Sequence, residues 1–171
     1  MAQYSNPAGT FIIAAAPGAN GVAQVETTPI VGNITGDGNA TFTITGAGIT
    51  GSPVAISVPV LNGDTPTVTA AKAAVVVNAN AAVSALYVAS SSVANFLLTA
   101  IKSAANDATL NIAYTNGTCT GLTPDATSDD TTAGVLGDFR GVDAGAFLVD
   151  TTNKKVYKNT GTAYIPVWTL Q

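Results

Sequence analysis

The chain has 171 residues, of which 47% are hydrophobic and only 9% are charged, and its formal net charge is −4. Soluble domains usually carry roughly 25% charged residues, so this composition is unusual. The six Lys and Arg residues are spread too thinly to neutralise a row of phosphates, and we therefore expect no nucleic-acid partner. The longest apolar runs, 11–16 and 73–77, fall far short of the roughly 20 residues that span a bilayer, so we expect no membrane partner either.

A surface with so few charges must consist largely of Thr, Ser, Asn, Gly and Ala side chains. An ordinary monomer keeps lysines and glutamates outside, where they discourage association, but this chain has a single glutamate, Glu26. Small side chains lose little conformational entropy when they are buried. The composition therefore predicts a protein that packs against copies of itself or against a partner.

Residues 1–35 predict an extended N-terminal arm. Prolines and glycines interrupt every possible regular element in this segment, yet it is too apolar for a freely solvated tail. Such a segment needs a host surface, which is either its own domain or a neighbouring subunit. The residues expected to make this contact are Phe11, Ile12, Ile13 and Ile30.

Residues 36–122 predict a central β-rich module that opens with a hairpin. Apolar and polar residues alternate over 40–45 and again over 54–60, as they do in half-buried strands. The segment between them, 46–53, is rich in turn residues. The two strands are therefore expected to pair through this turn.

One helix and further strands complete the predicted module. Asp64 or Thr65 can cap the helix, Pro66 suits its first turn, and apolar residues recur at helical spacing to about Ala82. Strands are then expected near 85–89, 94–101 and 108–114. The predicted fold class is mainly β (α+β), with a sandwich-like module of β-β-α-β-β order.

The C-terminal part divides into a connection and a small sheet. Residues 123–137 are polar and predict a linker or an exposed loop. Residues 138–171 predict an antiparallel β-meander with three short strands, near 144–149, 154–158 and 164–169. A meander of this size buries little on its own, so it should lie on the central module or assemble with copies of itself.

The residues that carry enzyme chemistry are nearly missing. The chain has no histidine, so it can build neither a His-based nucleophile system nor a histidine metal site. Residues 46–51 match the dinucleotide-binding fingerprint in letters, but a strand is expected after them where that motif needs a helix. The single cysteine, Cys119, has no basic neighbour to activate it and cannot form an internal disulfide. We expect no enzyme activity, no catalytic residue and no cofactor.

Two further patterns have an ordinary explanation. Asp125, Asp129 and Asp130 could supply oxygen ligands to calcium, but they lack the order of a calcium-binding loop and its closing Glu, which favours a solvated turn. Glycosylation acceptor patterns at Asn33, Asn39 and Asn116 are expected by chance in a Thr-rich chain without a secretory signal.

Two parts of the chain carry a resemblance. The central part contains Gly48-Ile-Thr-Gly-Ser-Pro53, Asn62-Gly-Asp64 before an Ala-rich helix, and Ala104-Ala-Asn-Asp-Ala-Thr-Leu-Asn-Ile-Ala113. It resembles a module met repeatedly in the structural proteins of tailed bacteriophages. The closing part has an Asp-Thr-Thr-Asn turn and a Lys-Val-Tyr strand between Gly145 and Gly161, followed by Pro166-Val-Trp168. It resembles the short C-terminal β-meander of phage capsid-surface and fibre proteins.

The resemblance implies a component of the virion. The expected function is a capsid decoration protein, of the cement or head-fibre kind, which binds the major capsid protein and stabilises the shell. It would be made in the cytoplasm of the host bacterium and lie on the capsid surface, with the arm residues Phe11, Ile12, Ile13 and Ile30 in contact with the capsid or a subunit. A homotrimer is expected, because trimers fit the local threefold positions of an icosahedral shell.

Two alternatives come from other classes of protein. The chain could be a tail component, either a tube subunit or a fibre segment. It could also be a carbohydrate-binding adhesion module, in which Tyr157, Tyr164 and Trp168 stack on sugar rings.

Overall fold

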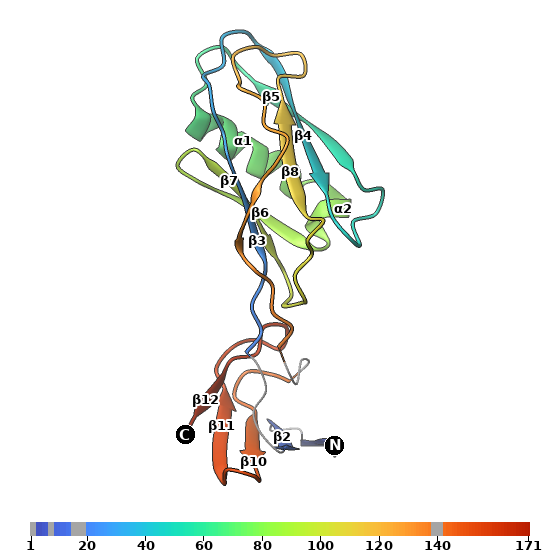
Figure 1. Ribbon diagram of the computed structural model, residues 1–171, viewed down its shortest axis with the longest axis vertical. Coiled ribbons are helices and arrows are strands. Elements are labelled where there is room, and N and C mark those ends of the chain that lie inside the picture. The colour runs from blue at the N-terminus through green and yellow to red at the C-terminus, as the bar shows by residue number, and fades with distance from the viewer. Residues whose placement is uncertain (1–2, 7–8, 15–19, 138–141) are drawn as a thin grey trace. The chain divides into compact units, whose positions relative to one another are not determined.

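The computed structural model describes residues 3–6, 9–14, 20–137 and 142–171, and for residues 3–14 only the backbone is considered (Figure 1). The chain forms two compact units. We call residues 24–101 and 107–133 the sandwich unit. We call residues 1–23, 102–106 and 134–171 the meander unit.

The sandwich unit contains two antiparallel sheets and one main helix, which confirms the predicted mainly β fold class with one helix. The larger sheet has the order β6-β7-β3-β9, made of β6 (Tyr87–Ser92), β7 (Asn95–Ala100), β3 (Val25–Pro29) and β9 (Asp129–Thr132). The smaller sheet has the order β5-β4-β8, made of β5 (Val54–Val60), β4 (Gly38–Thr45) and β8 (Asn111–Thr115). The helices are α1 (Pro66–Asn78) and the short α2 (Ala81–Ser84).

The predicted hairpin is confirmed, because β4 and β5 pair antiparallel from Gly38 opposite Val60 to Ile44 opposite Val54. Phe42 and Ile44 of β4 point to one face and are fully buried, as the alternation requires. The ring of Phe42 meets Phe96 of β7 edge-on at 5.4 Å between centroids and stacks on Tyr114 of β8 at 5.7 Å. Since β7 belongs to the larger sheet, this aromatic group joins the two sheets across the core.

The helix begins as predicted but ends earlier. The Thr65 side chain accepts a hydrogen bond from the Val68 N–H, and Pro66 opens α1. The helix stops at Asn78, because Asn80 takes an extended backbone and caps the separate short helix α2. The expected single helix to about Ala82 is therefore two helices.

Residues 24–35 belong to the sandwich unit, although the sequence suggested an arm that ends at residue 35. The strand β3 is a central strand of the larger sheet, and Ile30 is only 2% exposed in the core. Of the other arm residues, 1–2, 7–8 and 15–19 lie outside the described residues. The expected linker at 123–137 also differs, since it contains β9, which pairs with β3.

The meander unit has one five-stranded sheet of order β1-β2-β10-β11-β12. Its strands are β1 (Gln3–Asn6), β2 (Gly9–Ala14), β10 (Phe147–Asp150), β11 (Lys155–Asn159) and β12 (Trp168–Leu170). Strands β10, β11 and β12 pair antiparallel in sequence order, which confirms the predicted C-terminal meander. The strand β2, which contains Phe11, Ile12 and Ile13, pairs parallel with β10. Residues 138–141 of the predicted meander region lie outside the described residues.

Candidate functional site

Three loops of the sandwich unit meet at one end and form the loop cluster, defined as residues 31–37, 61–65 and 116–123 (Figure 1). Backbone hydrogen bonds join them directly. The Ile34 N–H donates to the Asp64 carbonyl at 2.9 Å, and the Thr35 N–H donates to the Thr120 carbonyl at 2.9 Å. The three loops therefore act as one preorganised surface.

Glycine is required where these loops approach most closely. Gly121 has a φ of +108°, a conformation that other residues rarely adopt. A Cβ atom on Gly121 would lie 2.1 Å from the Asn33 carbonyl oxygen. No larger side chain fits between the two loops at this point.

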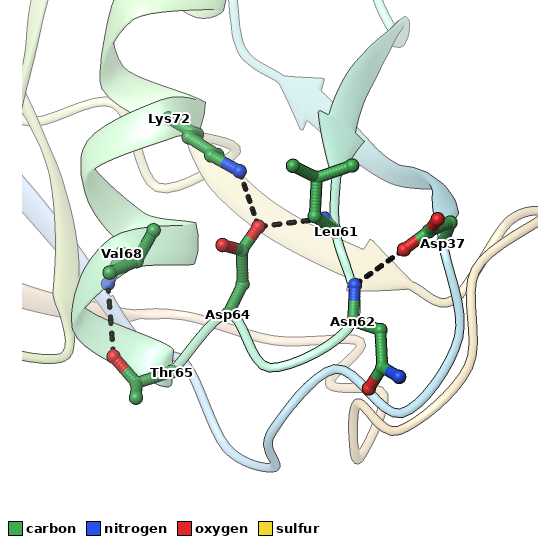
Figure 2. A network of polar contacts seen from close by, with 7 residues as sticks. All are labelled: Asp37, Leu61, Asn62, Asp64, Thr65, Val68 and Lys72. Atoms are coloured by element: carbon green, nitrogen blue, oxygen red, sulfur yellow. Dashed lines mark hydrogen bonds and ion pairs between the residues drawn. The ribbon is translucent and has the colours of Figure 1, made fainter.

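Asp64 connects the loop cluster to α1 (Figure 2). Its Oδ2 atom accepts a hydrogen bond from the Leu61 N–H at 2.8 Å and forms an ion pair with Lys72 Nζ. Burial alone would raise the pKa of Asp64, but the hydrogen bonds from Lys72 and Leu61 outweigh it and hold this pKa below its ordinary value. This carboxylate is a structural anion and is poorly suited to proton transfer.

A second aspartate braces the same loops. Asp37 accepts a hydrogen bond from the Asn62 N–H at 2.6 Å (Figure 2). The cluster also exposes two apolar side chains, Val31 at 48% and Leu61 at 59%. Both carboxylates thus accept hydrogen bonds from backbone donors of the loops, while the two apolar side chains remain exposed.

A row of polar side chains lies on the inward face of β3 and its preceding residue. Glu26 is 2% exposed, and its Oε1 atom accepts a hydrogen bond from Ser128 Oγ at 2.6 Å. The amide of Gln24 pairs with the backbone of Asp107, at 3.0 Å and 2.8 Å. The Oε2 atom of Glu26 and the hydroxyl of Thr28 have no hydrogen-bond partner among the described residues. Burial raises the pKa of Glu26, the side chains of Ser128 and Gln24 lower it, and the charges of Asp130 and Asp129 raise it, with a net shift above the ordinary value.

Three of the four sheet edges in the sandwich unit, those at β6, β8 and β5, are blocked by side chains or by a proline. The Asn78 amide donates to the Ala89 carbonyl at 2.9 Å and accepts from the Ala89 N–H at 2.8 Å, at the edge of β6. Along β8, Ser128 Oγ accepts from the Ile112 N–H at 2.8 Å. On the edge strand β5, exposed Pro59 has no N–H to offer. These edges resist pairing with a strand of another molecule.

Cys119 is the single cysteine, and Asp125, Asp129 and Asp130 are the three aspartates that could have supplied calcium ligands. Cys119 is 4% exposed, its thiol donates to the Asn116 carbonyl at 2.8 Å, and burial raises its pKa. Asp125 accepts from the Thr127 N–H at 3.1 Å within a turn, whereas Asp129 and Asp130 lie on the exposed strand β9. Across the described residues, no group of three or more potential metal-binding side chains is found.

The three aromatic residues proposed for sugar binding do not share an open surface. Trp168 is 7% exposed in the core of the meander unit, and Tyr157 packs against that core. Tyr164 is exposed, but Lys102 Nζ lies 4.7 Å from the centre of its ring. The stacking platform that a carbohydrate module needs is not formed by these residues.

The remaining sequence motifs also have local structural explanations. Residues 46–51 form the turn between β4 and β5, so the helix of a dinucleotide site does not follow them. The side chain of Asn116 bonds to both backbone groups of Leu122, at 3.0 Å and 2.9 Å. Asn33 is exposed in the loop cluster, and Asn39 lies within β4.

No described helix is both long and apolar enough to cross a membrane. Comparison of the chain with protein-family models, with curated proteins and with solved structures finds no significant match. The functional assignment therefore depends on the features of the chain itself.

Proposed function

We propose that this chain is a non-enzymatic structural protein of a bacteriophage virion, specifically a capsid decoration protein that binds the major capsid protein and stabilises the shell. The observation that carries the proposal is the uncharged, preorganised character of the exposed surface. The sheets expose Thr, Ser, Asn and Ala where ordinary soluble domains expose Lys and Glu. Such a surface serves permanent packing in a large assembly, where long charged side chains would cost conformational entropy on burial.

The outer side of α1 supports assembly into a homotrimer. Val68 and Val75 are seven residues apart, so they lie on the same side of the helix, and they are 40% and 71% exposed. Lys72 is paired with Asp64, so copies of the chain can approach this side without strong repulsion between like charges. Burying each valine in a subunit contact would contribute roughly 1.5 to 3 kcal/mol.

This contact is tested by matched lysine substitutions. Val75→Lys should convert the trimer to monomers in light scattering on purified protein, because it places a charge in the contact. Thr67→Lys adds the same charge on a different side of α1 and should leave the trimer intact. A monomeric mass for the unmodified protein, both alone and after addition of empty capsids, would contradict the trimer.

Only the first part of the arm, which contains β2, remains the proposed anchor to the capsid. Phe11, Ile12 and Ile13 lie in β2 of the meander unit, whereas Ile30 is already buried in the sandwich core. A deletion of residues 1–35 would remove the central strand β3, so it cannot separate anchoring from folding. Substituting Phe11, Ile12 and Ile13 with Thr in the full chain is the better design, because Thr removes most of the apolar surface and its β-branched side chain is suited to a strand.

The decisive experiment locates the chain on intact particles. Gold-labelled antibodies against the purified protein should bind the heads of phage particles made by bacteria that carry the gene, as seen by electron microscopy. Particles made without the gene should bind no gold and should take up the purified protein afterwards. Gold on tails alone would support the tail alternative, and particles that carry no label would refute a virion protein.

A further inference from the structure

Glu26 is a buried carboxyl covered by a segment that buries no residue of its own. We call residues 125–132 the covering segment. Asp125 and Ser128 are partly exposed, and the other six residues are exposed. The segment nevertheless lies against β3, where Glu26 is 2% exposed. Hydrogen bonds, rather than hydrophobic contacts, must therefore hold it in place.

These hydrogen bonds connect the covering segment to both sheets. Asp125 and Tyr114 exchange backbone hydrogen bonds at 2.8 Å and 3.1 Å, and Asn111 Nδ2 donates to the Ala126 carbonyl at 3.0 Å. On the other side, β9 pairs with β3, with an irregular register between Val25 and Glu26. Segments with few buried apolar contacts open at a lower free energy than the core around them.

Ser128 is the residue at which the covering segment meets the buried carboxyl. Its hydroxyl accepts from the Ile112 N–H at 2.8 Å and donates to Glu26 Oε1 at 2.6 Å. The other carboxyl oxygen, Oε2, has no hydrogen-bond partner among the described residues. The Ser128 hydrogen bond and the neighbouring Gln24 side chain therefore compensate a negative charge on Glu26 only in part while the segment is closed, and Asp129 and Asp130 lie next to it in the same segment.

We propose that Glu26 and Ser128 form a proton-operated latch, in which protonation of Glu26 holds the covering segment closed and ionisation of Glu26 drives it open. Opening would bring water to the carboxylate and move Asp129 and Asp130 away from it. Burial and the charges of these two aspartates raise the pKa of Glu26 in the closed state. The closed state thus binds the proton more tightly than the open state, and its advantage is lost as the pH rises through the pKa of the closed state.

Two other ionisable groups near Glu26, Tyr87 and Asp107, keep one charge state through that transition. Burial, followed by the charges of Asp107 and Glu26, raises the pKa of Tyr87 above its ordinary value of 10.0, so the phenol stays neutral. Burial opposes the ionisation of Asp107, but hydrogen bonds from Thr109 and Ala47 outweigh it and lower its pKa. Tyr87 and Asp107 therefore do not change charge in the pH range in which the raised pKa of Glu26 places its own ionisation.

The first experiment uses the fact that Glu26 is the only glutamate of the chain. Protein labelled with ¹³C-glutamate gives a single side-chain carboxyl resonance, and its titration midpoint should lie above the ordinary value of about 4.3. Hydrogen exchange of the covering segment, corrected for the intrinsic effect of pH, should accelerate up to tenfold per pH unit between the ordinary value and the pKa of the closed state, and should level off above it. Amides of the β4–β5 hairpin should show no such change. An ordinary midpoint, or exchange that does not vary with pH, would overturn the latch.

Two variants separate the latch from general stability. Glu26→Gln should keep the covering segment closed and remove its dependence on pH, whereas Asp143→Asn, which neutralises an exposed carboxylate in the meander unit, should retain that dependence. Ser128→Ala should speed exchange of the segment at every pH and move the carboxyl midpoint further upward, since a hydrogen bond to the ionised form is lost. Persistence of the pH dependence in Glu26→Gln would refute the proposal. If that variant does not fold, the resonance and exchange of the unmodified protein decide the matter.

Discussion

The two units differ in the size of their apolar cores, although both also bury polar side chains. The sandwich unit has a continuous apolar core built around Phe42, Phe96 and Tyr114. The apolar core of the meander unit consists of Val142, Ala146, Leu148 and Trp168, with Tyr157 packed against it. The meander unit also buries Asp150 and Asn159 completely. Where the apolar core is small, buried polar groups with well-placed hydrogen bonds determine the fold.

Asn159 shows how such a residue works. Its Nδ2 atom donates to the Val142 carbonyl at 2.8 Å, and its Oδ1 atom accepts from the N–H groups of Gly161 and Val167, both at 3.0 Å. One side chain thus connects three segments of the backbone. Asp150 has a similar role in the turn between β10 and β11, where hydrogen bonds from Asn153 hold the pKa of Asp150 below its ordinary value.

The largest loss of stability is expected from a substitution in the apolar core of the sandwich unit. Phe42→Ala should lower the free energy of unfolding by about 3 to 5 kcal/mol, because it leaves a cavity where the two sheets meet. Far-UV circular dichroism in urea follows this unit through α1, and the fluorescence of Trp168, the only tryptophan, follows the meander unit. The circular dichroism transition should shift to lower urea while the fluorescence transition stays in place. Thr67→Ala, at an exposed position on a different side of α1 from the proposed subunit contact, is the control and should shift neither.

The reverse pattern is expected for the buried amide of the meander unit. Asn159→Ala leaves one carbonyl and two N–H groups without their partner, which should cost about 2 to 3 kcal/mol. Only the fluorescence transition should shift. Asn20→Ala removes a single hydrogen bond to the Trp168 N–H and should have a smaller effect on the same transition. Equal shifts in both transitions would show that the units unfold together, contrary to the comparison.

The sequence predicted those elements in which local pattern and burial agree. In β4 and β5 the apolar positions alternate with a period of two, and the turn residues between them leave one way to pair. The strand β3 was hidden because its inward positions carry Glu26 and Thr28, which give no apolar alternation. The strand β9 has the sequence Asp-Asp-Thr-Thr, which is typical of a loop.

The candidate site was less predictable, because it depends on distant contacts. The pairing of Ser128 with Glu26 spans 102 positions, and nothing near either residue in the chain signals it. The loop cluster likewise joins residues about 85 positions apart, such as Thr35 and Thr120. One available signal was the isolation of Glu26, the single glutamate in a chain with so few charges. The cap at Thr65 was predicted because its hydrogen bond is local.

A smaller loss of stability is expected when the buried hydroxyl of Tyr114 is removed. This hydroxyl donates to the Pro29 carbonyl and accepts from the Val31 N–H, both at 3.0 Å, and so ties β8 to the end of β3. Tyr114→Phe keeps the ring stacked on Phe42 but removes both hydrogen bonds, and it should cost about 1 to 2 kcal/mol in the circular dichroism transition. Tyr164→Phe, at an exposed position, should leave this transition unchanged. A null result for Tyr114→Phe would mean that the apolar core alone fixes the end of β3.

The smallest effect is expected from the ion pair between Lys72 and Asp64. The Lys72 side chain is 33% exposed, so solvent screens the pair, and Lys72→Met should cost no more than about 1 kcal/mol. The effect should shrink in high salt and at low pH. Because the pKa of Asp64 is lowered in the folded protein, the stabilisation is present above the unfolded value and is lost as the pH falls through the folded value. A double-mutant cycle with Asp64→Asn isolates the pair from the hydrogen bond to Leu61. A coupling energy that stays constant from neutral to strongly acidic pH would show that Lys72 stabilises α1 through its methylene groups rather than through its charge.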